Sequence, residues 1–278
     1  MFLVFVIISL VIILFAAVVF CIASGKVSHE AKETAKIFYG LNCAHRGLHT
    51  KDLQVPENSI LAFEAAVKGG YGVETDVQLS RDGQVVVFHD ENLKRMCGID
   101  ERVNSKNWEE LSKLKLHGTN ECIPLLTEAL ETLGDTPLIV ELKPVGSNYR
   151  DLCEKTLKIM QKHGKRWCIE SFDPRIVRWY YKNAPEVLRG QLSRPPKNME
   201  GISYPPALLL GNLLTNSISR PHFIAYEISR YPLTVKLCRA MKPINFIWTV
   251  HPEHDVDKCE EENDTIIFEF YKPTPRFK

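Results

Sequence analysis

The order of apolar and polar positions divides the chain into an apolar start, a short polar stretch and a long alternating part. Residues 1–24 contain no charged side chain, and a helix that spans a bilayer needs roughly 20 apolar residues. Residues 25–40 are polar and mixed in charge, which predicts a short juxtamembrane helix or linker. From Leu41, short apolar runs and helical segments alternate about eight times, as in a parallel βα domain. We therefore expect a transmembrane helix, a linker and one domain over residues 41–278.

The alternating part predicts a closed barrel. The predicted strands are 41–44, 73–79, 84–88, 137–142, 167–170, 187–192, 222–226, 245–250 and 265–268. The predicted helices are 59–69, 125–133, 151–163, 174–181 and 231–241. Residues 91–122 are richer in charge and less periodic, so we interpret them as an insertion, and the pattern of residues 193–220 assigns no element. An α/β fold of the TIM (β/α)8 type takes about 250 residues and fits this count better than an open sheet.

One strand carries polar side chains on a single face. Within Val73–Leu79, Glu74, Asp76 and Gln78 alternate with apolar or β-branched residues, and Asp82-Gly83 then marks a hairpin turn. Parallel strands are covered on both faces. The carboxylates therefore point toward an interior site, although a solvated strand face is the alternative.

Polar or aromatic side chains also stand at or near the ends of several other predicted strands. They are His45, Glu74, Asp76, His89, Glu141, Lys143, Phe172 and Trp248. The carboxyl ends of barrel strands meet at one rim, so segments far apart in the chain would converge there. Three carboxylates, Glu74, Asp76 and Glu141, would repel one another without a cation between them. Oxygen ligands suit one divalent cation, Mg²⁺ or Ca²⁺.

The histidines and bases of this set suit the chemistry of a phosphate ester. Hydrolysis of a phosphodiester needs a base and an acid, and histidine can fill either role near neutral pH. Arg46 can hold a phosphate with two hydrogen bonds, and Lys143 can stabilise developing charge. A structural ion pair between Arg46 and Glu57 is the alternative for that arginine, and both can hold.

Composition and charge limit the partners and the compartment. The chain has 35 basic and 34 acidic residues, a net charge of +1, and this even balance gives no support for broad nucleic-acid binding, which needs a basic surface. Its eight scattered cysteines form no C-x-x-C pair and indicate free thiols in a reducing compartment, with disulfides as the alternative that an even count leaves open. Lys26, Lys32 and Lys36 follow the apolar segment and place the larger domain in the cytoplasm. The alternative is a signal peptide cleaved near Ala23 or Gly25, and a secreted domain.

Eight motifs in order over residues 42–268 resemble those of the glycerophosphodiester phosphodiesterases. They are His45-Arg46-Gly47, Pro56-Glu57-Asn58-Ser59, Glu74-x-Asp76, Gly83 through His89-Asp90, Ile123-Pro124-Leu125-Leu126-x-Glu128, Glu141-x-Lys143, Ser171-Phe172-Asp173-Pro174 and Trp248-Thr249-Val250. Each motif is weak by itself, and their shared order gives the resemblance its weight.

The resemblance implies a TIM barrel with a small insertion after the second strand. It also implies one divalent ion at Glu74, Asp76 and Glu141, and a catalytic pair of histidines at His45 and His89. We predict His45 as the base and His89 as the acid, an order that the sequence does not fix. The predicted substrate-binding residues are Arg46, Lys143, Glu57, Phe172 and Trp248.

The chain departs from the family pattern at its far end. The family usually ends its last strand with Thr-Asp-x-Pro, whereas this chain has Ile267-Phe268-Glu269-Phe270. His251 stands where the family often has asparagine, and residues 193–230 fit the pattern poorly. These departures concern the far wall of the pocket, where the head group of a substrate would bind.

The predicted function is that of a membrane-anchored, metal-dependent phosphodiesterase that cleaves glycerophosphodiesters to an alcohol and sn-glycerol 3-phosphate. A second substrate class is the lysophospholipids, which would give lysophosphatidic acid. Two further alternatives are a lyase that forms a cyclic phosphate and a non-catalytic, membrane-tethered binding module. The sequence leaves the head group, the ion and the oligomeric state open.

Overall fold

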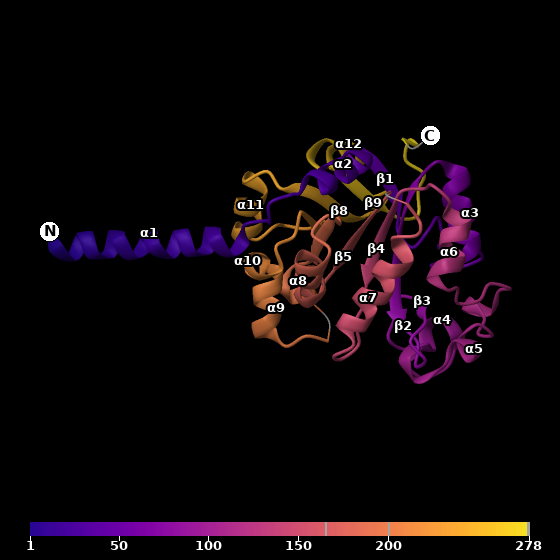
Figure 1. The fold of residues 1–278 in the computed structure, drawn as a ribbon. Coiled ribbons are helices and arrows are strands. Elements are labelled where there is room, and N and C mark those ends of the chain that lie inside the picture. Colours follow the sequence, from indigo (N-terminus) through magenta and orange to yellow (C-terminus); the bar gives the residue numbers. More distant parts are fainter. Residues whose placement is uncertain (165, 200, 277–278) are drawn as a thin grey trace.

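The computed structural model describes residues 1–164, 166–199 and 201–276 (Figure 1). Its strands are β1 Leu41–Ala44, β2 Gly72–Leu79, β3 Val85–Val87, β4 Leu138–Leu142, β5 Trp167–Ser171, β6 Arg189–Ser193, β7 Phe223–Glu227, β8 Ile244–Val250 and β9 Thr265–Phe268. Its α-helices are α1 Phe2–Ile22, α2 His29–Phe38, α3 Ile60–Gly69, α4 Lys94–Cys97, α5 Trp108–Leu111, α6 Leu126–Leu133, α7 Tyr149–Met160, α8 Pro174–Asn183, α9 Tyr204–Gly211, α10 Asn216–Ser219, α11 Leu233–Ala240 and α12 Val256–Glu262.

Eight parallel strands close into a barrel, as the alternation of elements predicts. Each of β4 to β9 pairs with the strand before it in the barrel, and β1 closes the ring by pairing with both β9 and β2. Helices lie around the outside (Figure 1). The barrel directs the carboxyl ends of all eight strands to one rim.

The hairpin strand β3 lies outside this ring. It pairs antiparallel with β2, with Val87 opposite Val77, and so joins the sheet only at its edge. Residues 91–122 follow it as short helical turns, α4 and α5 among them. This segment is the small insertion after the second barrel strand.

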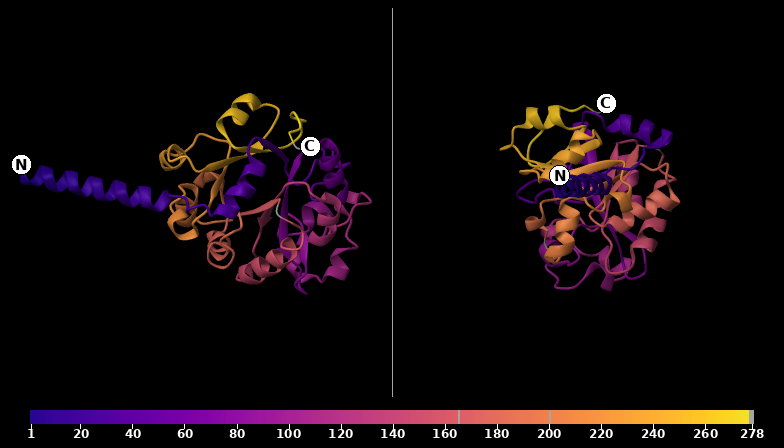
Figure 2. Two further views of the ribbon diagram at one scale, coloured as in Figure 1. Left: turned by 45° about the horizontal axis from the view of Figure 1, so that its top comes forward. Right: turned by 90° about the vertical axis from the view of Figure 1, so that its left-hand side faces the viewer.

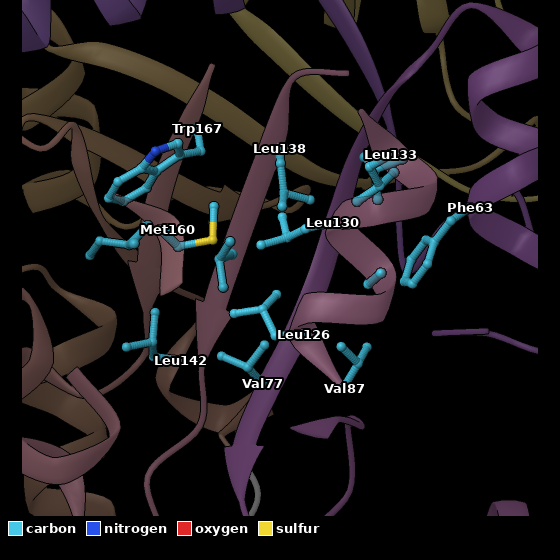
Figure 3. Close-up of a cluster of buried hydrophobic side chains, with 14 of the residues drawn as sticks. Phe63, Val77, Val87, Leu126, Leu130, Leu133, Leu138, Leu142, Met160 and Trp167 are labelled. Carbon is cyan, nitrogen blue, oxygen red and sulfur yellow. The ribbon is translucent and has the colours of Figure 1, made fainter. Parts of the chain in front are cut away.

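The layer between strands and helices forms the larger apolar core (Figure 3). Leu126, Leu130 and Leu133 of α6 face the sheet, because helical spacing of three and four residues puts them on one side. They meet outward-pointing strand residues such as Val77 and Leu138. The even positions of β2, including Glu74 and Asp76, therefore point into the barrel.

The other end of the barrel is covered by α2. Ser28 caps this helix by accepting a hydrogen bond from the backbone N–H of Ala31 at 3.1 Å. Phe38 is fully buried, and its ring centroid lies 5.8 Å from that of Phe246. The segment expected to be a juxtamembrane helix or linker thus contains a helix that packs on the barrel.

Helix α1 projects away from the barrel (Figures 1 and 2). Among the described residues it is the one helix that is long and apolar enough to span a membrane. Near its exit lie α9 and α10, within the region 193–220 to which the sequence pattern assigned no element. Helix α12 was likewise not predicted. The eight cysteines all lie in the described ranges and are free thiols.

Candidate active site

The barrel strands bring three carboxylates together at the carboxyl-terminal rim. Glu74 and Asp76 come from β2, and Glu141 comes from β4, where it pairs in register with Asp76. One carboxylate oxygen from each lies within 4.8 Å of the other two, and all three side chains are buried. Elements that are 65 residues apart in sequence thus form one acidic cluster, because Glu141 lies at the position next to Asp76 in the parallel ladder.

Two carboxyl groups of the cluster have pKa values that are shifted in opposite directions. Burial, and then the charges of Asp76 and Glu141, raise the pKa of Glu74 well above its usual value. Burial acts the same way on Asp76, but His89, Lys143 and Arg46 outweigh it and hold the pKa of Asp76 below its usual value. Asp76 therefore keeps its negative charge.

Two carboxylate oxygens of this cluster accept no hydrogen bond within the described part of the chain. Glu74 Oε1 and Asp76 Oδ1 are buried and accept no hydrogen bond from any residue that the structure describes. A buried carboxylate oxygen without a donor is costly, and a divalent cation would satisfy it. The donor set of three carboxylates fits the predicted Mg²⁺ or Ca²⁺.

A fourth carboxylate stands beside this cluster. Glu170 of β5 pairs in register with Glu141 and is 1% exposed. Its Oε2 has no partner among the described residues. Burial, and then Glu141, raise the pKa of Glu170 well above its usual value. Sequence reasoning missed this residue, although Glu170 falls on the alternating position that faces inward in Trp167–Ser171.

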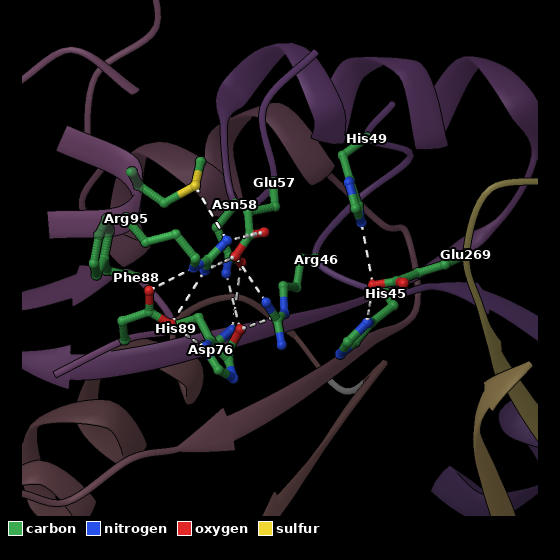
Figure 4. Close-up of polar contacts among 12 residues, drawn as sticks. His45, Arg46, His49, Glu57, Asn58, Asp76, Phe88, His89, Arg95 and Glu269 are labelled. Carbon is green, nitrogen blue, oxygen red and sulfur yellow. Dashed lines mark hydrogen bonds and ion pairs between the residues drawn. The ribbon is translucent and has the colours of Figure 1, made fainter. Parts of the chain in front are cut away.

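The turn after β1 places Arg46 beside Asp76 of the cluster (Figure 4). The backbone of Arg46 is left-handed, with φ 53°, and its N–H donates to Glu74 Oε2 at 3.1 Å. Its guanidinium Nη1 donates to Glu57 Oε1 at 2.8 Å, and its Nε lies 3.4 Å from Asp76 Oδ2. The ion pair between Arg46 and Glu57 is therefore present, and it aims the arginine at the acidic cluster.

Asn58 fixes Asp76 from the side. Its amide nitrogen donates to Asp76 Oδ2 at 2.8 Å, and its amide oxygen accepts from Thr75 Oγ1 at 2.7 Å. The backbone of Asn58 is also in the left-handed conformation, with φ 54°. The motif Pro56–Ser59 contains this residue, but only the fold reveals that Asn58 orients a carboxylate of the cluster.

The insertion contributes Arg95, which no sequence motif marks. Its two Nη atoms donate to Glu57 at 2.7 and 2.8 Å, and its Nε donates to Asp90 Oδ2 at 2.6 Å. Burial acts to raise the pKa of Glu57, but Arg95 and Arg46 outweigh it and lower that pKa to about 2. Both oxygens of Glu57 are thus occupied by arginines, so Glu57 lies behind Arg46 rather than in the cleft.

His45 pairs with Glu269 on the side of the site away from Asp76 (Figure 4). Its Nδ1 lies 2.5 Å from Glu269 Oε1, and its Nε2 lies 3.7 Å from Glu74 Oε2. His49 Nε2 lies 3.3 Å from the same oxygen of Glu269. Burial, and then Arg46, lower the pKa of His45 despite Glu269. Glu269 lies in Ile267–Phe270, where the chain departs from the family pattern. We expected this departure to concern the far wall of the pocket, but the structure places Glu269 against His45. The departure itself was the signal that could have found Glu269.

His89 and Lys143 lie on the cleft side of the cluster. His89 Nδ1 is 2.6 Å from Asp90 Oδ1. Lys143 Nζ is 3.1 Å from Glu141 Oε1 and 3.5 Å from Asp76 Oδ1. Burial alone would lower the pKa of the Lys143 ammonium, but these two carboxylates outweigh it and raise that pKa. Lys143 is therefore a fixed positive charge at the rim.

A cleft of about 1170 Å³ opens beside these groups. His89, Glu141, Lys143, Phe172 and Arg194 are among the residues that line it. The rings of Phe172 and Trp248 meet edge to face, with centroids 5.6 Å apart, and the Arg194 guanidinium lies 4.8 Å from the Trp248 ring. Trp248 is 8% exposed, so it supports the cleft wall from behind Phe172.

The predicted site residues thus fall into two groups. Those at the acidic cluster and the cleft are His45, Arg46, Glu74, Asp76, His89, Glu141, Lys143 and Phe172. Those behind them are Glu57, which pairs with Arg46, and Trp248, which packs on Phe172. The arrangement can hold a hard cation, keep two histidines on either side of it and place two fixed positive charges nearby.

Two named proteins are similar in sequence to part of this chain. It is 36% identical over 162 residues to a glycerophosphodiester phosphodiesterase of Caldanaerobacter subterraneus, which covers 54% of this chain and 65% of that protein. It is 33% identical over 176 residues to human lysophospholipase D GDPD1, covering 57% of this chain and 53% of that protein. The matched part therefore spans less than two thirds of the length of either relative.

Solved structures share the fold over most of the chain. A glycerophosphodiester phosphodiesterase from Thermotoga maritima is 27% identical with a TM-score of 0.63, covering 82% of this chain and 93% of that one. A phosphodiesterase from Oleispira antarctica, solved in complex with the product sn-glycerol-3-phosphate, is 23% identical with a TM-score of 0.70. The match covers 84% of this chain and 94% of the Oleispira antarctica chain.

The model of one protein family matches residues 45–270, which include all the site residues described above. That match begins at His45 and extends past Glu269, the two ends of the described constellation. The chain therefore belongs to the glycerophosphoryl diester phosphodiesterase family.

Proposed function

We propose that this protein hydrolyses glycerophosphodiesters to an alcohol and sn-glycerol 3-phosphate. The observation that carries the proposal is the buried cluster of Glu74, Asp76 and Glu141, with His45 on one side and His89 on the other. Membership of the family, and relatives named for this activity, support it. The complete constellation argues against a non-catalytic binding module.

The three carboxylates would hold one divalent cation, Mg²⁺ or Ca²⁺. Their donors are all oxygen, and two of these buried oxygens accept no hydrogen bond from the described residues. When bound, such a cation would neutralise phosphate charge and orient the ester. Asn58 and the Arg46 backbone N–H keep the carboxylates in place through hydrogen bonds of 2.8 and 3.1 Å.

Arg46 and Lys143 supply the remaining positive charge toward the phosphate. Both groups lie against Asp76, at 3.4 and 3.5 Å, on the side where a phosphate would meet the cluster. The guanidinium can offer two parallel donors to phosphate oxygens, while the ammonium acts as a point charge. Phe172 forms the apolar wall of the cleft.

His45 is suited to the role of base. Its lowered pKa keeps the ring neutral near pH 7, and a hydrogen bond from Nδ1 to Glu269 leaves Nε2 facing Glu74. Nε2 can then accept a proton from the water that attacks phosphorus. His89 lines the cleft with Nδ1 held by Asp90, so its other nitrogen can give a proton to the leaving alkoxide.

A lysophospholipid is the second candidate substrate, with lysophosphatidic acid as the product. Two observations favour it. The outer wall of the cleft is apolar, with Met199, Ile202 and Leu210 among its lining residues. The chain also resembles a human lysophospholipase D.

We propose that α1 is an uncleaved membrane anchor and that the domain lies on the cytoplasmic side. Ile22 at the end of α1 is 0% exposed and packs in a cluster with Leu213 and Tyr226. Cleavage near Ala23 would remove a residue from this packed cluster. Lys26 and the following lysines then stand on the inner side. The alternative is a cleaved signal and secretion.

A substrate panel with the purified full chain in detergent tests the function. Glycerophosphocholine and lysophosphatidylcholine are each offered after chelation, and then with Mg²⁺ or Ca²⁺, while phosphorus NMR follows the products. We expect a phosphomonoester that appears only with the cation. A cyclic phosphate as the end product would establish the lyase instead, and no turnover of either substrate would refute the proposed activity.

A further inference from the structure

An apolar surface with no assigned partner lies next to the cleft. From Gly201 to Ser219 the chain contains no charged residue. Within it, Tyr204 is 66% exposed and Leu209 is 48% exposed, and Ile202 and Leu208 are also exposed. A contiguous exposed apolar patch marks an interaction surface on most proteins. We call residues 201–210 the α9 segment.

The end of α1 is built into the same part of the molecule. The Asn216 side chain donates to the Ile22 carbonyl at 3.0 Å, and the Gly25 N–H donates to the Pro221 carbonyl at 2.7 Å. A Cβ at Gly25 would lie 2.7 Å from the Arg220 carbonyl oxygen, so the two backbones touch. Helix α1 therefore leaves the domain through a packed joint without a free linker.

This joint fixes which face meets a bilayer that α1 spans. The most apolar stretch of α1 contains no buried residue, and α9, α10 and α11 lie around its exit (Figures 1 and 2). Leu233, at the start of α11, is 72% exposed on this end as well. The Arg220 guanidinium lies 5.5 Å from the Phe20 ring, where an arginine would reach the lipid head groups.

We propose that the α9 segment rests in the same leaflet that α1 enters, and that it opens the cleft to lipid. The α9 segment has two sides. Leu208 and Leu209 are exposed outside the cleft, whereas Ile202 and Leu210 are among the residues that line it. A phosphodiester with one acyl chain could then pass from the bilayer along these side chains to the acidic cluster. The substrate part of this inference rests on the proposed function, and it names single-chain lysophospholipids as the class.

Membrane contact is tested without any need for activity. The full chain is reconstituted in phosphatidylcholine vesicles, and Leu208→Trp is compared with Leu61→Trp, a 38% exposed position on α3 at the far end of the domain. Brominated lipids should quench the added fluorescence of the first variant and not of the second. Equal quenching of the two variants would overturn the proposal. This result is also expected if a second copy of the chain, and not lipid, covers the α9 segment.

Substrate entry is tested with a pair of matched double variants in the same vesicles. Leu208→Gln/Leu209→Gln should lower the turnover of lysophosphatidylcholine in vesicles by about tenfold, because two apolar groups leave the lipid. Turnover of soluble glycerophosphocholine should stay within about twofold, since neither residue lines the cleft. The control, Leu61→Gln/Val67→Gln on α3, should change neither rate.

The outcomes separate this inference from the proposed function. A loss of both activities in the α9 double variant, or a loss of neither, would overturn the lipid route. If the wild-type chain turns over neither substrate, the proposed function fails, while quenching at Leu208 still decides whether the α9 segment contacts lipid.

Discussion

Replacing Glu269 by glutamine should slow catalysis while leaving substrate affinity nearly unchanged. The carboxylate holds His45 Nδ1 at 2.5 Å and lies 3.3 Å from His49 Nε2, but it does not line the cleft. A hydrogen bond to a charged group contributes about 1.5–3 kcal/mol and is about twice as strong as a neutral one. The amide should therefore cost about 0.75–1.5 kcal/mol, or roughly four- to thirteenfold in kcat.

The loss can be larger because an amide can also donate. If the glutamine NH₂ faces Nδ1, the ring proton moves to Nε2 and the proposed base has no free electron pair toward the cluster. Steady-state kinetics with glycerophosphocholine, with the melting temperature as a check of the fold, measure the effect. Glu253→Gln, at an exposed position, is the matched control. A kcat within twofold of wild type in Glu269→Gln would refute the positioning role of Glu269.

Three further predictions follow from other parts of the structure. Asn58→Ala should weaken the apparent affinity for Mg²⁺ about tenfold, since it removes the 2.8 Å hydrogen bond to Asp76. A Mg²⁺ titration of activity measures this affinity, and an unchanged midpoint would contradict the prediction. A saturating divalent cation should raise the melting temperature by a few degrees, because binding at 100 times Kd stabilises by about 2.7 kcal/mol, and no shift would argue against the acidic cluster as a cation site. Burial, and then Arg189, lower the pKa of His222 to about 3, so the fold holds this ring neutral. Its contribution to stability is complete above pH 6.5 and is lost as the pH falls toward 3. The free energy of unfolding should drop by about 2 kcal/mol more between pH 7 and pH 5 in the wild type than in His222→Gln, and equal drops would refute this.

The strands and the acidic cluster follow from short-range patterns. The alternation in Val73–Leu79 places Glu74 and Asp76 on one face, and the rule that parallel barrel strands end at one rim adds Glu141. Both steps need only the period of a strand and the direction of its neighbours. The sequence therefore predicts the barrel and the centre of the site.

The supporting contacts were beyond such reasoning because they join distant parts of the chain. Glu269 lies 224 residues from His45, and Arg95 reaches Glu57 from an insertion without a clear period. Helix α9 also escaped prediction. Leucines at 208, 209 and 210 leave no polar face to give a helical period, and the structure leaves much of this apolar surface exposed.

The role of the paired histidines around the acidic cluster is the central claim. Its most direct test is the turnover of glycerophosphocholine in ¹⁸O-labelled water by the full chain and by His45→Ala and His89→Ala. We predict cation-dependent glycerol 3-phosphate that carries ¹⁸O on phosphorus, and a loss of at least about a hundredfold in each folded variant. Turnover retained in either variant, or ¹⁸O found in the released alcohol, would contradict the account.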